Sequence, residues 1–322
     1  MNAPSVSIVL PTYNRARFLA RALDTIRAQS RADYEVLVID DNSTDETSGL
    51  LAQRAAEDRR IRPIRNRGPH GPAGARNTGI AEARAGWLAF LDDDDEWLPE
   101  KLTLFCAAQA PDVALIGSDY RMVEDDAGAG RTMREFLSQV MIPWWRGHPL
   151  ARAVFDPDEL ARSAAALENP RIIRAMALGG FLWPHTSSVM VRTDAARAAG
   201  GFDTGMHRTE DMRLWLKLLP MGRVVFIDQP LARYHIQGRD AGTSRRYAGQ
   251  SAERRLSRYK EMRDHLNLLK ELPRWGRFGE AERRFQKERI QAYHWYCAQA
   301  AAGLYPWRAR WHRLWAGGKT FA

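Results

Sequence analysis

The sequence predicts an α/β fold, with a mostly parallel central sheet flanked by helices and a helical extension at the C-terminal end. Short apolar runs alternate with helix-period segments over the first 120 of its 322 residues. These runs are apolar almost throughout, which is typical of strands that helices cover on both faces. Beyond about residue 240 the pattern is helical with charged faces. The sheet is therefore expected to end before the extension begins.

The first 120 residues are expected to supply five strands and the helices between them. Strands are predicted where the apolar runs lie, at 6–11, 34–41, 61–66, 87–91 and 113–120. Helices are predicted where apolar residues recur with a period near 3.6, at 15–29, 44–56, 76–85 and 99–109. Ser43 and Glu46 form the capping-box pattern that would start the second of these helices.

The second half of the chain is expected to add strands after an irregular insertion. Residues 130–180 predict helices joined by Pro and Gly turns. Strands are predicted at 186–192 and 223–228, and Thr209 is placed to open a helix between them. We assign these segments to the same domain as the first 120 residues.

Composition narrows the class of protein. A hydrophobic share of 45% with 27% charged residues is ordinary for a soluble globular chain. A strand pattern begins where a signal peptide would lie, and no apolar run approaches the roughly 18 residues of a membrane span. Cys106 and Cys297 have neither disulfide nor metal-ligand spacing. We therefore expect two free thiols and a cytoplasmic protein.

The net charge of +9 belongs to the C-terminal extension. Residues 251–322 hold 16 Lys or Arg and 7 Asp or Glu, so the first 250 residues hold 32 of each and balance. A basic chain would suit a nucleic-acid-binding protein, but these residues lie in helical segments without a recognition motif. We therefore expect no nucleic-acid partner, although strong, salt-sensitive binding would revive that class.

Polar residues follow three of the predicted strands at the same end. Residues 12–14 follow the first strand, 40–41 close the second, and the four aspartates at 92–95 close the fourth. The carboxyl ends of parallel strands meet at one edge, and open α/β sheets bind their ligands there. The sequence therefore predicts one site at this edge.

The four aspartates are the strongest indication of chemistry. In an extended segment side chains alternate, so Asp92 and Asp94 would share one side and Asp93 and Asp95 the other. Two convergent carboxylates suit a hard divalent cation such as Mg²⁺ or Mn²⁺. The alternative is a solvated acidic loop that favours the N-terminus of the helix after Pro99. The position at the ligand-binding edge favours the metal.

The other two clusters suit a nucleotide. Tyr13 offers an aromatic face to a base, and Asp41 could accept hydrogen bonds from a base N–H or from ribose hydroxyls. The glycine-rich stretch 68–79 carries Arg76 and Asn77 and could wrap a diphosphate as a flexible loop. Taken singly, the same residues could be a Pro-led turn, a helix cap and an ordinary loop.

Four motifs then occur in order: VSIVLPTYNR, VLVIDDNSTDET, GPAGARNTGI and WLAFLDDDDEWLPEKL. Together they resemble the nucleotide-sugar-binding half of family-2 glycosyltransferases, which have the Rossmann-like GT-A fold. The resemblance is strong over residues 5–110 and looser to about 235. It implies an inverting enzyme that uses a nucleotide-diphosphate sugar, expected to be a UDP-sugar, with Mn²⁺ or Mg²⁺ as cofactor.

The resemblance also implies donor-site roles by position. Residues 12–13 match those that hold the base, Asp41 matches the acid that hydrogen-bonds it, and Asp92 matches the acid near the ribose. The implied metal ligands are Asp94 and Asp92, the two ends of a D-x-D motif, with Asp93 standing where the family varies. The nucleotide-sugar-binding set is therefore expected to comprise Pro11, Thr12, Tyr13, Asn14, Asp41, Arg76, Asn77, Asp92 and Asp93.

The resemblance places the acceptor chemistry in the second half of the chain. Asp211 matches the acid that deprotonates the acceptor hydroxyl, with Glu210 beside it. The alternative is that both are simply acids in the first turn of the helix after Thr209. His185 and Trp183 precede a predicted strand and are expected to line the acceptor pocket, although a histidine there is more often structural.

Three segments with separate roles are expected. Residues 1–120 would bind the donor, 121–240 would form the acceptor-binding and catalytic half of the same domain, and 241–322 would form a basic, Trp-rich extension. The acceptor could be a glycan, a lipid-linked compound or another hydroxyl compound. A metal-dependent nucleotidyltransferase stays open as a second class of enzyme, although the Gly- and Arg/Lys-rich signature usual near its N-terminus is absent from this sequence.

The C-terminal extension ends in an aromatic helix pattern. Leu304, Trp307, Trp311 and Trp315 fall at helical spacing and form one stripe, while arginines occupy other faces. Such a helix suits peripheral contact with the inner face of a membrane. The alternative is that the tryptophans pack on the protein itself or on a second subunit in a homodimer.

Overall fold

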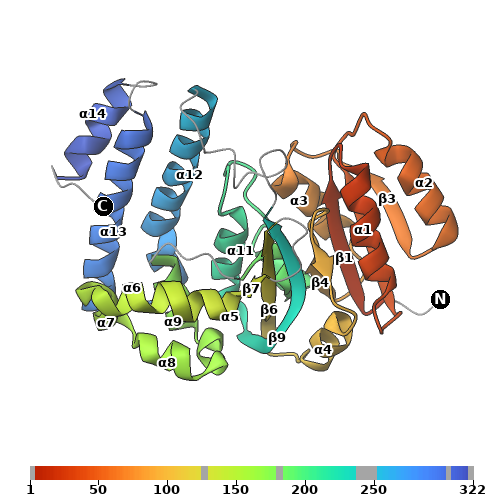
Figure 1. The fold of residues 1–322 in the computed structure, drawn as a ribbon, viewed down its shortest axis with the longest axis horizontal. Helices are drawn as coiled ribbons and strands as arrows, with labels where there is room; N and C mark the ends of the chain where they lie inside the picture. The colour runs from red at the N-terminus through yellow and green to blue at the C-terminus, as the bar shows by residue number, and fades with distance from the viewer. Residues whose placement is uncertain (1–3, 125–129, 179–183, 237–251, 302–305, 318–322) are drawn as a thin grey trace. The chain divides into compact units, whose positions relative to one another are not determined.

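Strands from distant parts of the chain form one sheet in the computed structural model, which describes residues 4–124, 130–178, 184–236, 252–301 and 306–317 (Figure 1). The main path of this nine-stranded sheet has the order β3-β2-β1-β4-β8-β6-β9-β5, and β7 pairs with β6. The strands are β1 (Val6–Thr12), β2 (Tyr34–Asp40), β3 (Ile61–Arg65), β4 (Trp87–Phe90), β5 (Glu96–Trp97), β6 (Val113–Glu124), β7 (Arg131–Thr132), β8 (Val189–Arg192) and β9 (Arg223–Ile236).

The described chain divides into two compact units. The sheet unit comprises Met1–Phe136, Pro184–Thr204 and Lys217–His235. The helical unit takes the rest of the chain, namely Leu137–Trp183, Gly205–Leu216 and Ile236–Ala322. The helices of the sheet unit are α1 (Ala16–Arg27), α2 (Thr47–Glu57), α3 (Pro72–Glu82), α4 (Lys101–Ala107), α5 (Met133–Phe136) and α10 (Thr193–Ala198), with single 3₁₀ turns at Thr186–Ser188 and Leu219–Met221.

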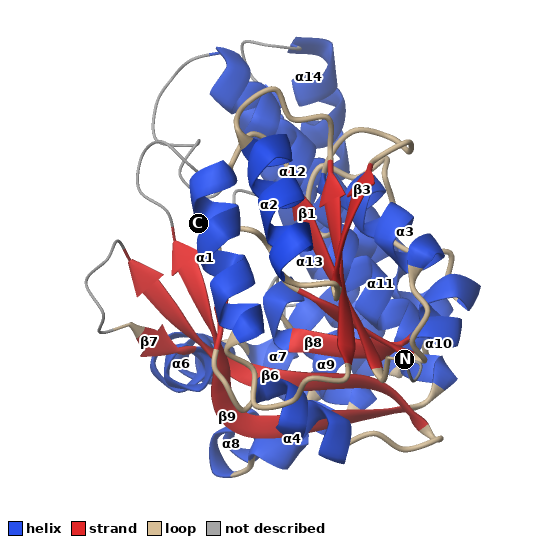
Figure 2. Cartoon of the chain, turned by 90° about the vertical axis from the view of Figure 1, so that its right-hand side faces the viewer, coloured by secondary structure: helices blue, strands red, loops and turns tan. Residues whose placement is uncertain are grey.

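Strands β3, β2, β1 and β4 are parallel to one another. Because right-handed crossovers connect them, α1 and α2 cover one face and α3 covers the other (Figure 2). Ile8, Leu10 and Leu37 are fully buried between these layers, each contributing about 1.5–3 kcal/mol of hydrophobic stabilisation. The predicted fold class is confirmed in this half of the sheet.

The other half of the sheet is antiparallel. Strand β8 runs antiparallel to both β4 and β6, and β5 pairs antiparallel with β9. Strand β9 is much longer than the predicted strand 223–228, and its far end pairs with the two residues of β5 that follow the aspartates. The sheet is therefore mixed, and its antiparallel strands bring later segments of the chain beside the aspartate loop.

Two local predictions are wrong. Most of the stretch expected to be a flexible glycine-rich loop is helix α3, which begins at Pro72, a residue whose fixed φ suits the first turn. Helix α2 begins at Thr47, and its start is stabilised by Asp45, whose carboxylate accepts the Thr47 N–H at 3.1 Å. Ser43 instead accepts a hydrogen bond from Asn14 N–H at 2.9 Å and so makes no capping box.

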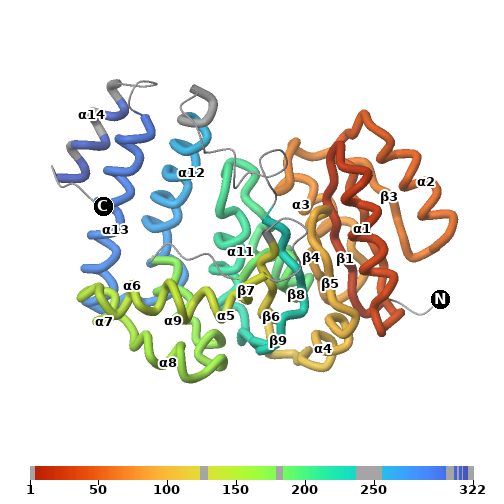
Figure 3. The backbone as a smooth tube through the Cα atoms, viewed as in Figure 1, coloured from red at the N-terminus to blue at the C-terminus, as the bar shows by residue number. Residues whose placement is uncertain are grey.

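The helical unit is built from short helices and two long ones. Helices α12 and α13 lie side by side (Figure 3), and α13 also contacts α7, α9 and α14. None of the described helices is both long and apolar enough to cross a membrane. The elements are η1 (Leu137–Met141), α6 (Ile142–Gly147), α7 (Pro149–Val154), α8 (Pro157–Arg162), η2 (Ala164–Glu168), α9 (Pro170–Leu178), α12 (Ala252–Glu271), η5 (Leu272–Trp275), α13 (Glu280–Ala301) and α14 (Pro306–Trp315), with α11 (Glu210–Leu218) ending in the sheet unit.

Both cysteines are free, as the sequence predicts. Cys106 is half-buried in α4, and Cys297 is fully buried in α13. Burial raises the pKa of the Cys297 thiol to about 12, so this side chain packs as a small apolar residue.

Candidate active site

The aspartate loop is a turn and not an extended segment. The Asp95 N–H donates to the Asp92 carbonyl at 3.1 Å. The chain therefore reverses between these two residues and brings their side chains to the same side. The expectation that Asp95 lies on the side opposite Asp92 is wrong for this reason.

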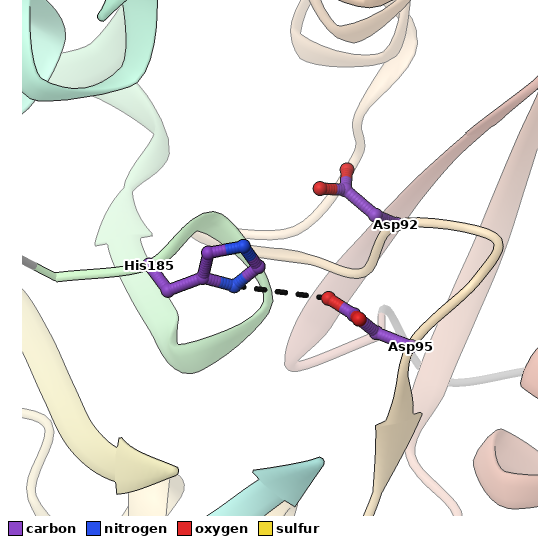
Figure 4. A group of neighbouring side chains, drawn as sticks. All are labelled: Asp92, Asp95 and His185. Carbon is purple, nitrogen blue, oxygen red and sulfur yellow. Dashed lines mark ion pairs between the residues drawn. The ribbon is translucent and has the colours of Figure 1, made fainter. Parts of the chain in front are cut away.

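Asp92 and Asp95 converge with His185, which precedes β8, to form a cluster suited to a metal ion (Figure 4). One ligand atom from each residue lies within 4.8 Å of the others. The His185 Nδ1 is 3.7 Å from the Asp95 carboxylate. Two carboxylates and an imidazole form a donor set that fits Mn²⁺ or a similar divalent cation.

Ser187 links the two ends of this turn. Its hydroxyl donates to the Asp95 carboxylate at 2.5 Å and accepts the Asp92 N–H at 3.1 Å. The His235 N–H donates to the same carboxylate at 3.1 Å, so β9 also fixes Asp95. Because Asp95 is only 1% exposed, these contacts hold its side chain in one orientation.

The middle of the turn is neutralised by Arg15. This guanidinium lies 3.0 Å from the Asp93 carboxylate and 2.9 Å from that of Asp94. Asp93 also accepts a hydrogen bond from the Thr12 hydroxyl at 2.8 Å. The first motif and the aspartate motif, about 80 residues apart, therefore meet at the predicted edge of the sheet.

The charges in this turn are unequal. Burial opposes ionisation of Asp92, but Arg76 and His185 outweigh it and lower the pKa of that carboxyl. Burial raises the pKa of Asp93 to about 6, although Arg15 opposes the shift. Burial also raises the pKa of Asp94. Burial and the neighbouring charges of Asp94 and Asp92 together raise the pKa of Asp95 well above its usual value. A divalent cation would favour the ionised forms of all these groups.

Helix α3 supplies the arginine beside Asp92. Gly79 lets α3 pack closely on β1, because a Cβ there would lie 2.3 Å from a Val9 methyl group. Arg76 is 5% exposed and donates to the Asp92 carboxylate at 2.6 Å. Asn77 instead bonds the backbone N–H and carbonyl of Phe202, both at 2.8 Å. Arg76 therefore faces the aspartates, and Asn77 positions the helix.

Tyr13 and Asp41 lie at the ends of β1 and β2. The Tyr13 ring is 46% exposed and meets the His70 ring edge-on at 4.9 Å. Asp41 is buried and accepts hydrogen bonds from Asn66 Nδ2 at 2.6 Å and from the Gly71 N–H at 2.7 Å. His70 Nδ1 lies 2.7 Å from the same carboxylate, so most of its acceptor capacity is already used.

Pro11 and Asn14 complete the first predicted motif. Pro11 is a buried residue of β1. Asn14 has a positive φ of 53°, a conformation that asparagine tolerates better than most residues. Its side-chain oxygen accepts the Thr44 N–H at 2.7 Å, which joins the loops after β1 and β2.

Residues 7–159 match the family model described as Glycosyl transferase family 2. This part of the chain belongs to that family. The predicted resemblance is therefore confirmed, and the four ordered motifs that carried it lie inside the matched region.

Two curated relatives of this chain have specific names. One, from Campylobacter jejuni, is the GalNAc(5)-diNAcBac-PP-undecaprenol beta-1,3-glucosyltransferase, 38% identical over 101 residues, which cover 31% of this chain and 33% of that protein. Another, from Escherichia coli, is the UDP-Glc:alpha-D-GlcNAc-diphosphoundecaprenol beta-1,3-glucosyltransferase, 31% identical over 127 residues, which cover 39% and 49%. The chain thus spans a third to a half of these relatives.

A solved structure matches nearly the whole chain. It is the mannosyltransferase PcManGT from Pyrobaculum calidifontis in complex with GDP-Man and Mn²⁺, with a TM-score of 0.57 and 17% identity. The match covers 98% of this chain and 85% of that one. At this identity the likeness establishes the shared GT-A fold, including the mixed sheet and C-terminal helices.

The predicted base lies in the helical unit. Asp211 and Glu210 are half-buried residues in the first turn of α11. Within the same unit, the buried Asp264 accepts the Arg208 N–H at 3.0 Å, and Arg213 donates to Glu271 at 2.9 and 3.0 Å. These contacts from α12 fix the start of α11. Trp183, predicted beside His185, lies outside the described residues.

Sequence reasoning missed four residues of this site. Arg15 stood at the end of a quoted motif, but its partners lie about 80 residues away. Asp95 was assigned to the wrong side because a turn replaced the extended segment. Ser187 and His70 act through contacts that no local pattern reports. The dense clustering of aspartates was the one available signal, since charges this close require a compensating cation.

Proposed function

We propose that the chain transfers a glycosyl group from a UDP-sugar to a hydroxyl of a lipid-linked glycan, with inversion and with the help of a divalent cation. The observation that supports this most directly is the convergence of Asp92, Asp95 and His185 at the edge of the sheet where Thr12 and Tyr13 lie. Two relatives with diphosphoundecaprenol-linked acceptors in their names support the acceptor class, and one name includes UDP-Glc.

The donor would occupy the edge of the sheet unit. Tyr13 would stack on the base, with Asp41 and His70 at its edge, and Asp92 would lie near the ribose. Asp92 would hold the cation together with Asp95 and His185, the group the geometry favours, or with Asp94, the ligand that the motif implies. A cation bound there would neutralise charge that develops on the leaving diphosphate.

The residues of the chain would then carry the transfer as follows. Asp211 accepts the proton of the acceptor hydroxyl while the acceptor oxygen forms its bond to the anomeric carbon. The bond from that carbon to the UDP oxygen breaks in the same step, which inverts the configuration. Arg76 and Arg15 hold the aspartate turn in place during the transfer. In this scheme residues 1–120 bind the donor and 121–240 the acceptor, with 241–322 as an extension.

The first experiment is thermal stability of the full chain with UDP, GDP, dTDP or ATP, each with Mn²⁺ or EDTA. A ligand that binds the native state raises the melting temperature by mass action. We expect a shift with UDP that requires Mn²⁺, followed by UDP release when UDP-glucose and a lipid-linked acceptor are supplied. If no nucleoside diphosphate shifts the melting temperature, the proposal fails. Pyrophosphate release from a nucleoside triphosphate would favour a nucleotidyltransferase instead.

Asn variants identify the metal ligands. Asp95→Asn abolishes the Mn²⁺-dependent shift if Asp95 completes the site with Asp92, and Asp94→Asn abolishes it if the motif assignment holds. Asp24→Asn is the control, because Asp24 is an exposed acid of α1 that pairs with Arg54 at 3.1 Å.

A further inference from the structure

Helix α6 of the helical unit has two apolar faces. One face is buried, with Ile142 at 1% and Trp145 at 0% exposure, and Leu137 of the adjoining η1 is equally buried at 1%. The Trp145 ring packs edge-on against Phe155 at 5.0 Å. This buried face packs α6 against the rest of the unit.

The opposite face is also apolar, yet it is exposed. It consists of Val140 in the π-helix η1 and of Pro143, Trp144 and Gly147 in α6, all exposed and here called the 140–147 stripe. Val140 is 42% and Trp144 39% exposed. Only two other large apolar side chains of the described residues are as exposed, Tyr13 in the donor site and Trp315 in α14. Adjacent exposed apolar residues mark an interaction surface.

The charge around the stripe is positive. Residues 136–155 contain no Asp or Glu, and they contain Arg146 and Arg152. Arg152 is exposed, and the Arg289 guanidinium lies 5.5 Å from the centre of the Trp144 ring. Arg146 pairs with Asp158, Nε to carboxylate at 2.7 Å, which offsets one of these charges. Glu288 offsets a second charge, because it lies 2.9 Å from Nε2 of His148, whose ring contacts Trp144. The exposed Arg152 leaves the surroundings of the stripe net positive, which suits an anionic surface.

We propose that the 140–147 stripe docks the helical unit on an anionic lipid surface, with Val140 and Trp144 in the interface and the arginines toward the headgroups. A stable protein–protein interface buries about 800 Å² on each partner. Two large apolar side chains on a short helix supply much less than that. A lipid interface needs no matching surface, and a tryptophan ring beside an arginine is typical of that environment.

This inference does not depend on the proposed function, because it uses no residue of the donor site. It concerns a different surface from the C-terminal tryptophans. Of those, Trp315 is 59% exposed and stacks on His294 at 5.9 Å, and the side chains of Trp307 and Trp311 lie outside the described ones. Because the sequence also favours membrane contact for the C-terminal helix, Trp315→Ser separates that surface from the 140–147 stripe.

The test is sedimentation of the full chain with vesicles of phosphatidylcholine alone or mixed with phosphatidylglycerol. We expect the wild type to bind the mixed vesicles, and the double variant V140S/W144S to bind at least about tenfold more weakly, because two apolar side chains leave the interface. Arg152→Glu should weaken binding several-fold on the mixed vesicles only, an effect that high salt removes. Trp315→Ser should bind as the wild type does.

Three results would overturn the proposal. The wild type would fail to bind the mixed vesicles, or Trp315→Ser would lose binding while V140S/W144S kept it. The third result would be a wild type that is a dimer in solution and a V140S/W144S variant that is a monomer. The stripe would then be the interface between two copies of the chain. Circular dichroism, melting temperature and the UDP shift check that each variant is folded. A protein that binds vesicles but shows no UDP shift would leave the docking surface standing while the proposed function failed.

Discussion

One buried cluster in each unit shows a different treatment of ionisable groups. At the edge of the sheet unit, Arg76 helps to lower the pKa of Asp92, and Arg15 opposes the rise in pKa that burial causes at Asp93 and Asp94. In the helical unit, His294 and His312 lie almost fully buried with their Nδ1 atoms 2.8 Å apart. Burial lowers the pKa of each to about 4, so this pair is uncharged at neutral pH.

The difference shows that burial alone does not decide whether an ionisable group keeps its charge. A buried group loses its charge unless an opposite charge or a bound ion compensates the lost hydration. The edge of the sheet supplies arginines and a place for a cation. Beside the histidine pair lie the Tyr259 hydroxyl, 3.4 Å from His312, and Lys270, whose positive charge lowers both pKa values further. Four variants test this contrast, from the largest expected effect to the smallest.

Asp92→Asn should have the largest effect. It removes the anion that faces Arg76 and the cluster with His185, and so it leaves a buried guanidinium without its carboxylate. We expect the transfer rate to fall about a hundredfold or more, roughly 3 kcal/mol in the barrier. The measurement is UDP release from UDP-glucose at saturating Mn²⁺. Activity close to that of the wild type would show that the charge at this position is not used.

Lys101→Met should stabilise the protein. It tests what it costs to bury an amino group without an opposite charge inside the sheet unit. Lys101 is 0% exposed, and its Nζ has no hydrogen-bond partner among the described residues. Burial lowers the pKa of Lys101 well below its usual value. At any pH below the ordinary lysine pKa, folding therefore costs the free energy of removing the proton from this side chain. We expect the free energy of unfolding at pH 7 to rise by about 2 kcal/mol.

The control for this variant is Lys101→Ala, which removes the charge but leaves a cavity beside the Phe105 ring that lies 3.9 Å from Nζ. Chemical denaturation should rank the proteins with Met above the wild type and Ala below Met. A wild type more stable than the Met variant at pH 7 would mean that the ammonium group is compensated.

The fold and the edge of the site could be predicted because they depend on local patterns. Apolar runs such as 6–10 and 87–91 mark parallel strands, and the end of each strand places its polar residues at a common edge. Partners within the site could not be predicted, since Arg15 and the aspartates meet only through the folded sheet. The turn at Asp92–Asp95 reversed one side-chain assignment because a single hydrogen bond replaced the extended geometry.

Arg15→Gln should have an intermediate effect. It removes the cation between Asp93 and Asp94, whose carboxylates would then repel each other. Because the Arg15 side chain is 31% exposed, the cost is discounted to about 1–2 kcal/mol of unfolding free energy. Mn²⁺ should restore part of the loss, measured as a larger metal-induced rise in melting temperature than in the wild type. An equal rise in both proteins would place the cation away from these two carboxylates.

The smallest effect is expected from the histidine pair, as a dependence of stability on pH. At pH above the ordinary histidine value of 6.5 the pair is uncharged in both the folded and the unfolded chain. Between pH 6.5 and about 4 the unfolded chain takes up protons that the folded pair refuses, so stability is lost as pH falls. Between about pH 7 and pH 6 we expect a fall of about 1 kcal/mol, or about 2–4 °C in melting temperature.

Leucine at both positions, H294L/H312L, should flatten this fall without abolishing it, because burial also lowers the pKa of His265 in the same unit. A double variant whose melting temperature falls as steeply as that of the wild type would mean that the pair takes up protons in the folded state. The histidine pair would then hold buried charge as the edge of the sheet does.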